Sequence, residues 1–354
     1  MTQYDFSRCS ILLVEDDINI RNAFENLLRS FKFGQIETAS NGEDAIEYLK
    51  VMKQDYHPGP DLIISNLVMS PIDGLLLLRW IRGSKDCPNR MVPFLMISGA
   101  TSRDNVNSSR DLGANEFIAR PFSPTSVYEQ ILKIIDYPRQ FVTSHDYFGP
   151  DRRRSINETG AALPERRKKS DEDITIIYSS DKKIMQGTPK GVYYWRLQNT
   201  LRSKAAGGPI EHKVKGEIPS DVIEEAERQL EKTTLEFKSW GLEYLVELTE
   251  FCTKASTETG SRSQYFSDIN RLAMKLRGQG STFDYPLIST ISTMLYDLTV
   301  EGCPEDDKNI KAAEFHIETM RAVIRDDITG DGGETGRHLV EELQIHLKEI
   351  DVIT

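Results

Sequence analysis

The chain has 354 residues, of which 38% are hydrophobic and 28% charged, and its formal net charge is −11. One hydrophobic core seldom serves a chain of this length, so we expect two or three domains. The composition excludes a fibre and a wholly disordered chain. No run of about 18 apolar residues occurs, which excludes a membrane span, and the N-terminal residues lack a secretory-signal pattern, so a cytoplasmic location is the expectation.

Charge is distributed unevenly and divides the chain into three segments. The net charge is −4 over residues 1–136, +6 over 137–219 and −13 over 220–354. The middle segment has basic clusters at 152–154 and 166–169 among Gly, Ser and Pro residues, so we interpret it as a linker. Within it, 174–178 and 192–197 have the composition of short strands that could pair. The four cysteines lack C-x-x-C spacing, so neither a zinc cluster nor a disulfide framework is indicated.

Five short apolar runs in the first segment predict buried parallel strands. They cover 11–14, 36–39, 62–64, 94–97 and 117–119, and amphipathic segments separate them. In the clearest of these segments, Ile20, Phe24, Leu27 and Phe31 recur at the spacing of one helix face. The alternation predicts a doubly wound α/β sheet, in which the chemistry lies at the carboxyl ends of the strands.

Polar residues stand at those strand ends in a recognisable order. Glu15 and Asp16 follow the first strand, Asn66 the third and Ser98 the fourth, while Phe117 and Arg120 lie in and after the fifth. Over residues 10–136, this order and spacing resemble the receiver domain of two-component response regulators. The resemblance implies a flavodoxin-like fold with a five-stranded parallel sheet. Without the joint pattern, Asp16 and Asp17 would be interpreted as helix caps and Phe117 as a core residue.

The resemblance also implies a role for each position. The acidic pocket, Glu15 with Asp16, helps hold Mg²⁺ in that family. In that family, an aspartate at the position of Asn66 accepts a phosphoryl group from a histidine. Ser98 and Arg120 occupy the positions that contact this group, and Phe117 occupies the switch position.

The phosphoacceptor position departs from the family pattern. Asn66 offers a neutral amide where the family has an aspartate, and an amide cannot form the acyl phosphate. Asp61 and Asp73 are not obvious replacements, because Asp61 lies about 16 Å back along an extended strand and Asp73 is in the following loop. The sequence therefore predicts that the phosphoacceptor is missing.

A second departure points the same way. Arg120 replaces the family lysine, and its planar guanidinium does not reproduce a compact ammonium. Losing one carboxylate also weakens the attraction of the pocket for a divalent cation. We expect that no cofactor is required, and that Mg²⁺ binding, to which Asp16 would contribute, is weakened.

From residue 220 the pattern changes to long amphipathic helices. The first spans 220–251, and four more are predicted near 263–277, 286–299, 308–327 and 336–350. Residues 220–354 are therefore expected to form an all-α, up-and-down bundle with one extra terminal helix.

Residues 271–283 resemble the histidine-phosphotransfer motif. Met274 stands at the histidine position, Arg277 at the lysine position, and Gly278 follows. At about 100° per residue, Met274 lies about 140° from Ile269 on the helix, away from the predicted apolar stripe, so it is expected to face solvent. A thioether cannot perform the phosphotransfer of a histidine, whereas an exposed methionine suits a protein contact. The alternative is an unrelated bundle with a chance match to a short motif.

Three later histidines could in principle replace the missing one. His316, His338 and His346 lack the flanking motif, so we expect them to be surface or packing residues.

These observations favour a non-enzymatic adaptor or modulator of a phosphorelay, with a pseudo-receiver joined to a phosphotransfer-like bundle. Its expected partner is a histidine kinase, a phosphotransfer protein or another response regulator, and homo-oligomerisation stays open; no membrane partner is expected. The first alternative is a conventional phosphorelay response regulator in which Asn66 is an engineered or strain-specific change. The second is a regulator that binds nucleic acid or an anionic surface through the basic linker, which the acidic last segment disfavours.

Overall fold

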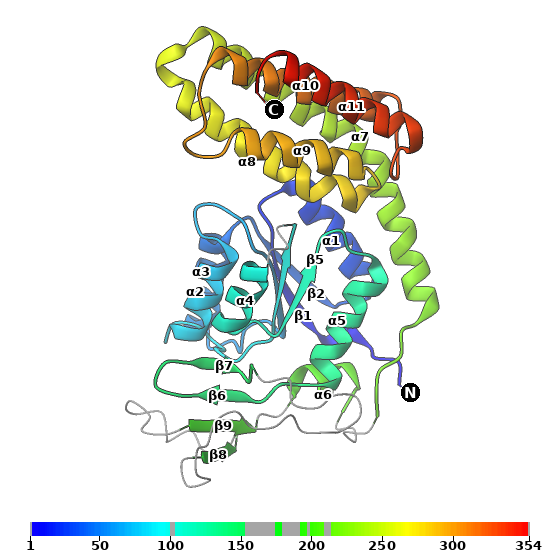
Figure 1. Cartoon of the computed structure of the whole chain (residues 1–354). Helices are drawn as coiled ribbons and strands as arrows, with labels where there is room; N and C mark the ends of the chain where they lie inside the picture. Colours follow the sequence, from blue (N-terminus) through cyan, green and yellow to red (C-terminus); the bar gives the residue numbers. More distant parts are fainter. Residues whose placement is uncertain are drawn as a thin grey trace. The chain divides into compact units, whose positions relative to one another are not determined.

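The computed structural model describes residues 2–99, 103–152, 174–178, 192–196, 199–208 and 214–352. The chain divides into two compact units, Met1–Ala119 with Ser123–Glu227, and Arg120–Phe122 with Arg228–Thr354. The first unit contains the parallel sheet, and the second contains most of the helical region (Figure 1).

The first unit is built on a five-stranded parallel sheet. Its strands are β1 (Ser10–Val14), β2 (Gln35–Ala39), β3 (Leu62–Asn66), β4 (Phe94–Ser98) and β5 (Glu116–Ala119), in the order β2-β1-β3-β4-β5. Every residue of β3 and β4 is buried, as central parallel strands require, whereas the edge strand β2 is largely exposed or half-buried. The predicted receiver-type fold is confirmed, and each strand is one or two residues longer than predicted.

Five helices lie on the two sides of this sheet (Figure 1). They are α1 (Ile18–Ser30), α2 (Gly42–Gln54), α3 (Gly74–Gly83), α4 (Arg103–Leu112) and α5 (Pro124–Asp136). Side chains of Asp17, Asn41, Asp73 and Ser123 accept hydrogen bonds from backbone N–H groups at the starts of α1, α2, α3 and α5. These caps fix where each helix begins after its strand.

A second sheet belongs to the same unit. Its strands are β6 (Phe141–Thr143), β7 (Phe148–Pro150), β8 (Ile174–Tyr178) and β9 (Val192–Arg196), in the order β7-β6-β9-β8. The predicted pairing of 174–178 with 192–197 is confirmed over 192–196, as a parallel ladder. Buried Arg82 of α3 donates to the carbonyl oxygens of Gly113 and Arg90, and its guanidinium lies 5.1 Å from the centre of the Phe141 ring.

The segment before the bundle is also tied to the first sheet. Helix α6 (Thr200–Ala205) accepts a backbone hydrogen bond from Asp5 through the Ala205 carbonyl, and Thr2 forms a parallel bridge with Gly216. The linker expected over 137–219 therefore contains folded elements. The sequence predicts β8 and β9 among these elements, but not β6, β7 or α6. Of the two basic clusters, only Arg152 lies within the described residues.

The C-terminal region is all-helical, as predicted. Its helices are α7 (Ser220–Thr257), α8 (Arg262–Gly280), α9 (Pro286–Leu298), α10 (Asp307–Arg325) and α11 (Gly333–Glu349). Helices α8 to α11 pack in succession, each on the next, and Phe237 of α7 stacks on Phe283 with ring centres 5.3 Å apart. In the part of the chain that the structure describes, no helix combines the length and apolar character needed to cross a bilayer.

Candidate functional site

The parallel register gathers the predicted site residues at one edge of the sheet. Strand β3 lies between β1 and β4, and its last residue, Asn66, pairs with Ile97 of β4. Ser98 ends β4, and Glu15 follows β1 directly. Glu15, Asn66 and Ser98 are all buried. The sequence prediction that these residues share one pocket thus agrees with their positions at neighbouring strand ends.

The Asn66 carboxamide faces three acceptors, which share the two hydrogens of its NH₂ group. Its Nδ2 donates to Glu15 Oε1 and to Asp16 Oδ1, each at 3.2 Å, and to the Val68 carbonyl oxygen at 3.0 Å. An amide NH₂ is the only part of this side chain that can donate, so the three acceptors fix its orientation. The amide therefore connects the acidic loop after β1 with the loop after β3.

The acidic loop has further internal contacts. The Asp17 backbone N–H donates to Glu15 Oε1 at 3.4 Å, and Arg21 Nη1 donates to the Glu15 carbonyl oxygen at 2.6 Å. The Asp17 carboxylate accepts from the backbone N–H groups of Asn19 and Ile20. Asp17 is thus the cap of α1, whereas Asp16 turns its carboxylate towards Asn66.

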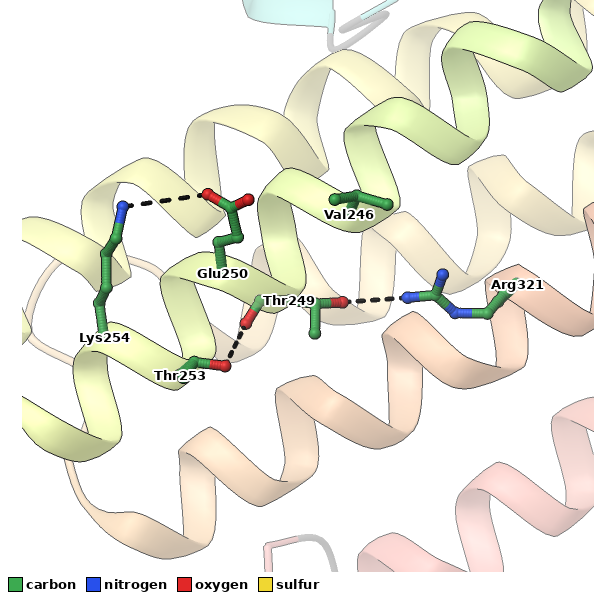
Figure 2. A pocket seen from close by; sticks show the side chains of 6 residues that line it. All are labelled: Val246, Thr249, Glu250, Thr253, Lys254 and Arg321. Carbon is green, nitrogen blue, oxygen red and sulfur yellow. Dashed lines mark hydrogen bonds and ion pairs between the residues drawn. The ribbon is translucent and has the colours of Figure 1, made fainter.

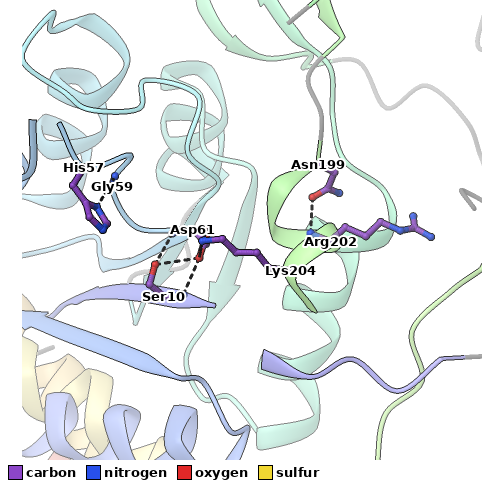
Figure 3. Close-up of polar contacts among 7 residues, drawn as sticks. All are labelled: Ser10, His57, Gly59, Asp61, Asn199, Arg202 and Lys204. Carbon is purple, nitrogen blue, oxygen red and sulfur yellow. Dashed lines mark hydrogen bonds and ion pairs between the residues drawn. The ribbon is translucent and has the colours of Figure 1, made fainter. Parts of the chain in front are cut away.

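Neither nearby aspartate takes the place of Asn66. Asp61 precedes β3 at the opposite end of the strand, where its carboxylate accepts from the Ser10 backbone N–H at 2.9 Å and pairs with Lys204 Nζ (Figure 3). Asp73 caps α3 by accepting from the Leu76 N–H at 2.7 Å. The prediction that no replacement carboxylate stands in the pocket is consistent with these positions.

The remaining receiver positions lie as follows. Phe117 is half-buried on β5 and packs against the hydrophobic core, in agreement with the simpler interpretation of a core residue. Arg120 follows β5 directly, before Pro121, and is grouped with the helical unit. Phe117 is thus in the same sheet as the pocket.

In the helical unit, the residues around Met274 are buried or turned away from the core as the helical periodicity predicts, except that Met274 is less exposed than expected. Ile269, Leu272, Ala273 and Leu276 are buried, and Met274 lies outside this stripe. Met274 is, however, half-buried rather than fully exposed. A helical wheel gives only the direction of a side chain, and a long, flexible methionine can cover neighbouring surface.

The basic and glycine positions of the motif also have defined surroundings. The Arg277 guanidinium lies 5.1 Å from the centre of the Tyr296 ring on α9. Gly278 is half-buried, and the close approach of α8 to α9 occurs two residues later, at Gly280.

The three later histidines do not form a replacement site. His316 is buried in α10, and its Nδ1 lies 2.7 Å from the Ala312 carbonyl oxygen. His338 and His346 are exposed on α11, with ring nitrogens 3.3 and 3.4 Å from carboxylate oxygens of Glu342 and Glu349 one turn further on. The prediction of packing and surface residues is confirmed.

The helical unit also has an open pocket of about 300 Å³. Val246, Thr249, Glu250, Thr253 and Lys254 of α7 line it together with Arg321 of α10 (Figure 2). Arg321 Nη2 donates to Thr249 Oγ1 at 3.0 Å, and Lys254 pairs with Glu250 at 4.0 Å. The polar groups that line this pocket thus bind one another.

Sequence reasoning missed the polar contacts that fasten the later segments to the sheet. Lys204 Nζ pairs with Asp61 (Figure 3). Asn199 Nδ2 donates to the Ile135 carbonyl oxygen at 2.8 Å. Lys204 and Arg202 are both basic residues of this short segment, but nothing in the sequence pattern indicates that Asp61 is the partner of Lys204.

Comparisons with known proteins cover the first part of the chain. A family model for the response regulator receiver domain matches residues 11–132, and the C-terminal region has no family assignment. Chemotaxis protein CheY-3 of Vibrio cholerae serotype O1 is 29% identical over 126 residues, which are 36% of this chain and 91% of that protein. A probable transcriptional regulator, ycf27, of Pyropia yezoensis is 28% identical over 134 residues, which are 38% of this chain and 50% of that protein.

Solved structures match a similar share of this chain. The signal receiver domain of a signal transduction histidine kinase from Syntrophus aciditrophicus has 28% sequence identity, with 36% of this chain and 89% of that chain covered and a TM-score of 0.31.

Proposed function

Starting from the response regulator receiver domain at residues 11–132, which marks a signalling protein of the two-component kind, we propose that this protein is a phosphorylation-independent adaptor or modulator. It acts by docking to other signalling proteins and performs no enzymatic reaction. Its partner is a histidine kinase, a phosphotransfer protein or another response regulator.

The observation that carries the proposal is the chemistry at Asn66. Phosphoryl transfer to a receiver requires an anionic oxygen that attacks phosphorus, and the carboxamide of Asn66 has no such oxygen. Its NH₂ group is directed at Glu15 and Asp16, so the amide is engaged as a donor. Asp61 and Asp73 are engaged elsewhere, at the other end of β3 and at the start of α3.

The docking part of the proposal rests on α8. The buried stripe of α8 faces its own bundle, which leaves the Met274 side of the helix for contacts with other molecules. Methionine is flexible and polarisable, and it adapts to varied partner surfaces. The resemblance to a phosphotransfer motif, with Arg277 next to this surface, favours a receiver as the partner.

The first test is phosphorylation of the full chain by a small phosphoryl donor such as acetyl phosphate. We expect the intact mass of the wild-type protein to stay unchanged, with Asn66→Asp treated in parallel. A wild-type protein that gains a labile phosphoryl group at the sheet edge would contradict the proposal. Gain by Asn66→Asp alone would show that Asn66 is the reason for the loss.

The second test is docking by purified receivers and kinases of the same organism, measured with the full chain. Met274→Glu should weaken the interaction at least about tenfold, because it places a charge in the contact. Ile345→Glu on α11 is the matched control, since Ile345 is an exposed apolar residue on another helix. Equal affinity of wild type and Met274→Glu would exclude the α8 surface as the contact.

A further inference from the structure

The acidic pocket of this receiver departs from the cation site of its family. That site is built to hold Mg²⁺, which binds oxygen ligands at about 2.0–2.1 Å in near-octahedral geometry. Here the Nδ2 of Asn66 stands 3.2 Å from both Glu15 Oε1 and Asp16 Oδ1. An amide nitrogen has no free lone pair to give a metal, and its hydrogens carry positive partial charge. The residues present therefore do not fit a magnesium ion in the family position.

We infer that the Asn66 amide takes the place of the divalent cation, so that hydrogen bonds hold the pocket together without metal. The amide supplies hydrogen-bond donors to the two carboxylates that a cation would otherwise bridge. It also donates to the Val68 carbonyl oxygen, which joins the loop after β1 to the loop after β3.

Rotating the amide would not restore a site. A turn of about 180° about the last side-chain torsion would bring Oδ1 next to three acceptor oxygens and remove all three hydrogen bonds. Glu15 and Asn66 are buried, so the loss of hydrogen bonds between them costs more free energy than it would at an exposed site. The orientation that satisfies the pocket is the orientation that excludes a cation.

No other cation site offsets this loss within the described ranges. Among those residues, no cluster of three His, Cys, Asp or Glu side chains has the arrangement to hold a metal ion. The inference concerns the pocket itself and does not rest on docking by α8.

The experiment uses the full chain and the ions Mg²⁺ and Mn²⁺. Calorimetric titration with Mg²⁺ and Mn²⁺ electron paramagnetic resonance should show no saturable binding to the wild-type protein, and its unfolding midpoint should be the same in chelator and in millimolar Mg²⁺. In Asn66→Asp, three carboxylates share the pocket, so we expect a lower midpoint in chelator that Mg²⁺ restores, and an affinity at least about tenfold higher than in the wild type. Adding Asp16→Asn to this variant should abolish the gain.

Saturable Mn²⁺ binding by the wild type that Asp16→Asn removes would overturn the inference. If Asn66→Asp does not fold, Asn66→Ala supplies the second comparison, because it removes the amide without adding charge. The unfolding midpoint of Asn66→Ala in chelator should be lower than that of the wild type, and Mg²⁺ should raise it. If the two proteins have the same midpoint in chelator, the inference is also overturned. Metal binding without phosphorylation would refute this inference alone, whereas phosphorylation of the wild type would refute the proposed function.

Discussion

The Nζ atom of Lys204 lies 2.7 Å from Oδ1 of Asp61, although 143 positions separate the two residues in the sequence. The Asp61 side chain is 7% exposed, and its carboxylate also accepts from Ser10. The contact ties α6 to the start of β3, at the end of the sheet opposite the acidic pocket. A helix within the segment predicted to be a linker is therefore part of the same unit as the parallel sheet.

Replacement of Lys204 by Met should destabilise the receiver unit. The aliphatic part of the side chain is kept, but the Asp61 carboxylate loses its cation. We expect a loss of about 1 kcal/mol in the free energy of unfolding, since Lys204 itself is partly exposed. Urea denaturation measures this loss.

The matched control for this experiment is Lys32→Met. Lys32 pairs with Asp221 at 3.9 Å, and both side chains are largely exposed, so its removal should change stability by less than about 0.5 kcal/mol. Equal effects of the two substitutions would show that burial of Asp61 does not matter.

The sheet and its strand ends could be predicted from the sequence because the local pattern of apolar residues determines them. Apolar runs locate β3 and β4, and the carboxyl ends of parallel strands meet at one edge of a sheet. Asn66 and Ser98 could therefore be assigned to one pocket from the sequence alone. The stripe formed by Ile269, Leu272 and Leu276 likewise follows from helical spacing.

The contacts that could not be predicted are set by single polar atoms. The buried Arg82 contacts the Phe141 ring of β6 and donates to the Gly113 carbonyl oxygen, and these contacts leave no periodic trace in the sequence. The direction of the Asn66 amide depends on Val68 and Asp16 together, and a helical wheel does not give the half-burial of Met274.

Arg82 of α3 should be important for the stability of the second sheet, which it contacts through the Phe141 ring. Burial lowers the pKa of its guanidinium to about 10, so it stays charged at neutral pH, and it donates to the Gly113 oxygen at 3.1 and 3.0 Å through two nitrogens. Arg82→Lys keeps the charge but not this fork, and we expect a loss of about 2–4 kcal/mol. Hydrogen exchange should also show faster exchange in β6 and β7.

Arg79→Lys, at an exposed position of the same helix, is the comparison for Arg82. It should leave both stability and the exchange of the hairpin unchanged. An Arg82→Lys protein as stable as Arg79→Lys would show that the guanidinium fork is dispensable.

Acid should weaken the helical unit through His316. Its Nδ1–H donates to the Ala312 carbonyl, while Nε2 is buried with no hydrogen-bond partner in the described part of the chain, and burial lowers the pKa of this histidine. As the pH falls below about 6.5, the unfolded chain takes up a proton that the folded chain refuses, so stability falls. The loss continues until the pH reaches the lowered pKa.

One proton can account for at most about 1.4 kcal/mol per pH unit, so unfolding should be measured between pH 7.5 and about 5.5. His316→Leu should show a shallower decline than the wild type over that interval. His338→Leu, which removes an exposed histidine, should decline like the wild type. Parallel declines for all three proteins would exclude His316 as the cause.

The turn that joins α8 to α9 depends on the absence of a side chain at Gly280. A Cβ atom there would lie 2.7 Å from the backbone nitrogen of Ser289 and 2.7 Å from the carbonyl oxygen of Tyr285. Backbone atoms cannot move aside as a flexible side chain can, so Gly280→Ala should cost about 1–3 kcal/mol. Gly260→Ala is the matched control, because nothing lies within 4 Å of its added Cβ. Thermal unfolding of the full chain measures both.

A shifted turn should also weaken partner binding in Gly280→Ala, because Met274 lies on the same helix as Gly280. Unchanged stability together with unchanged binding would show that α8 and α9 can separate at no cost.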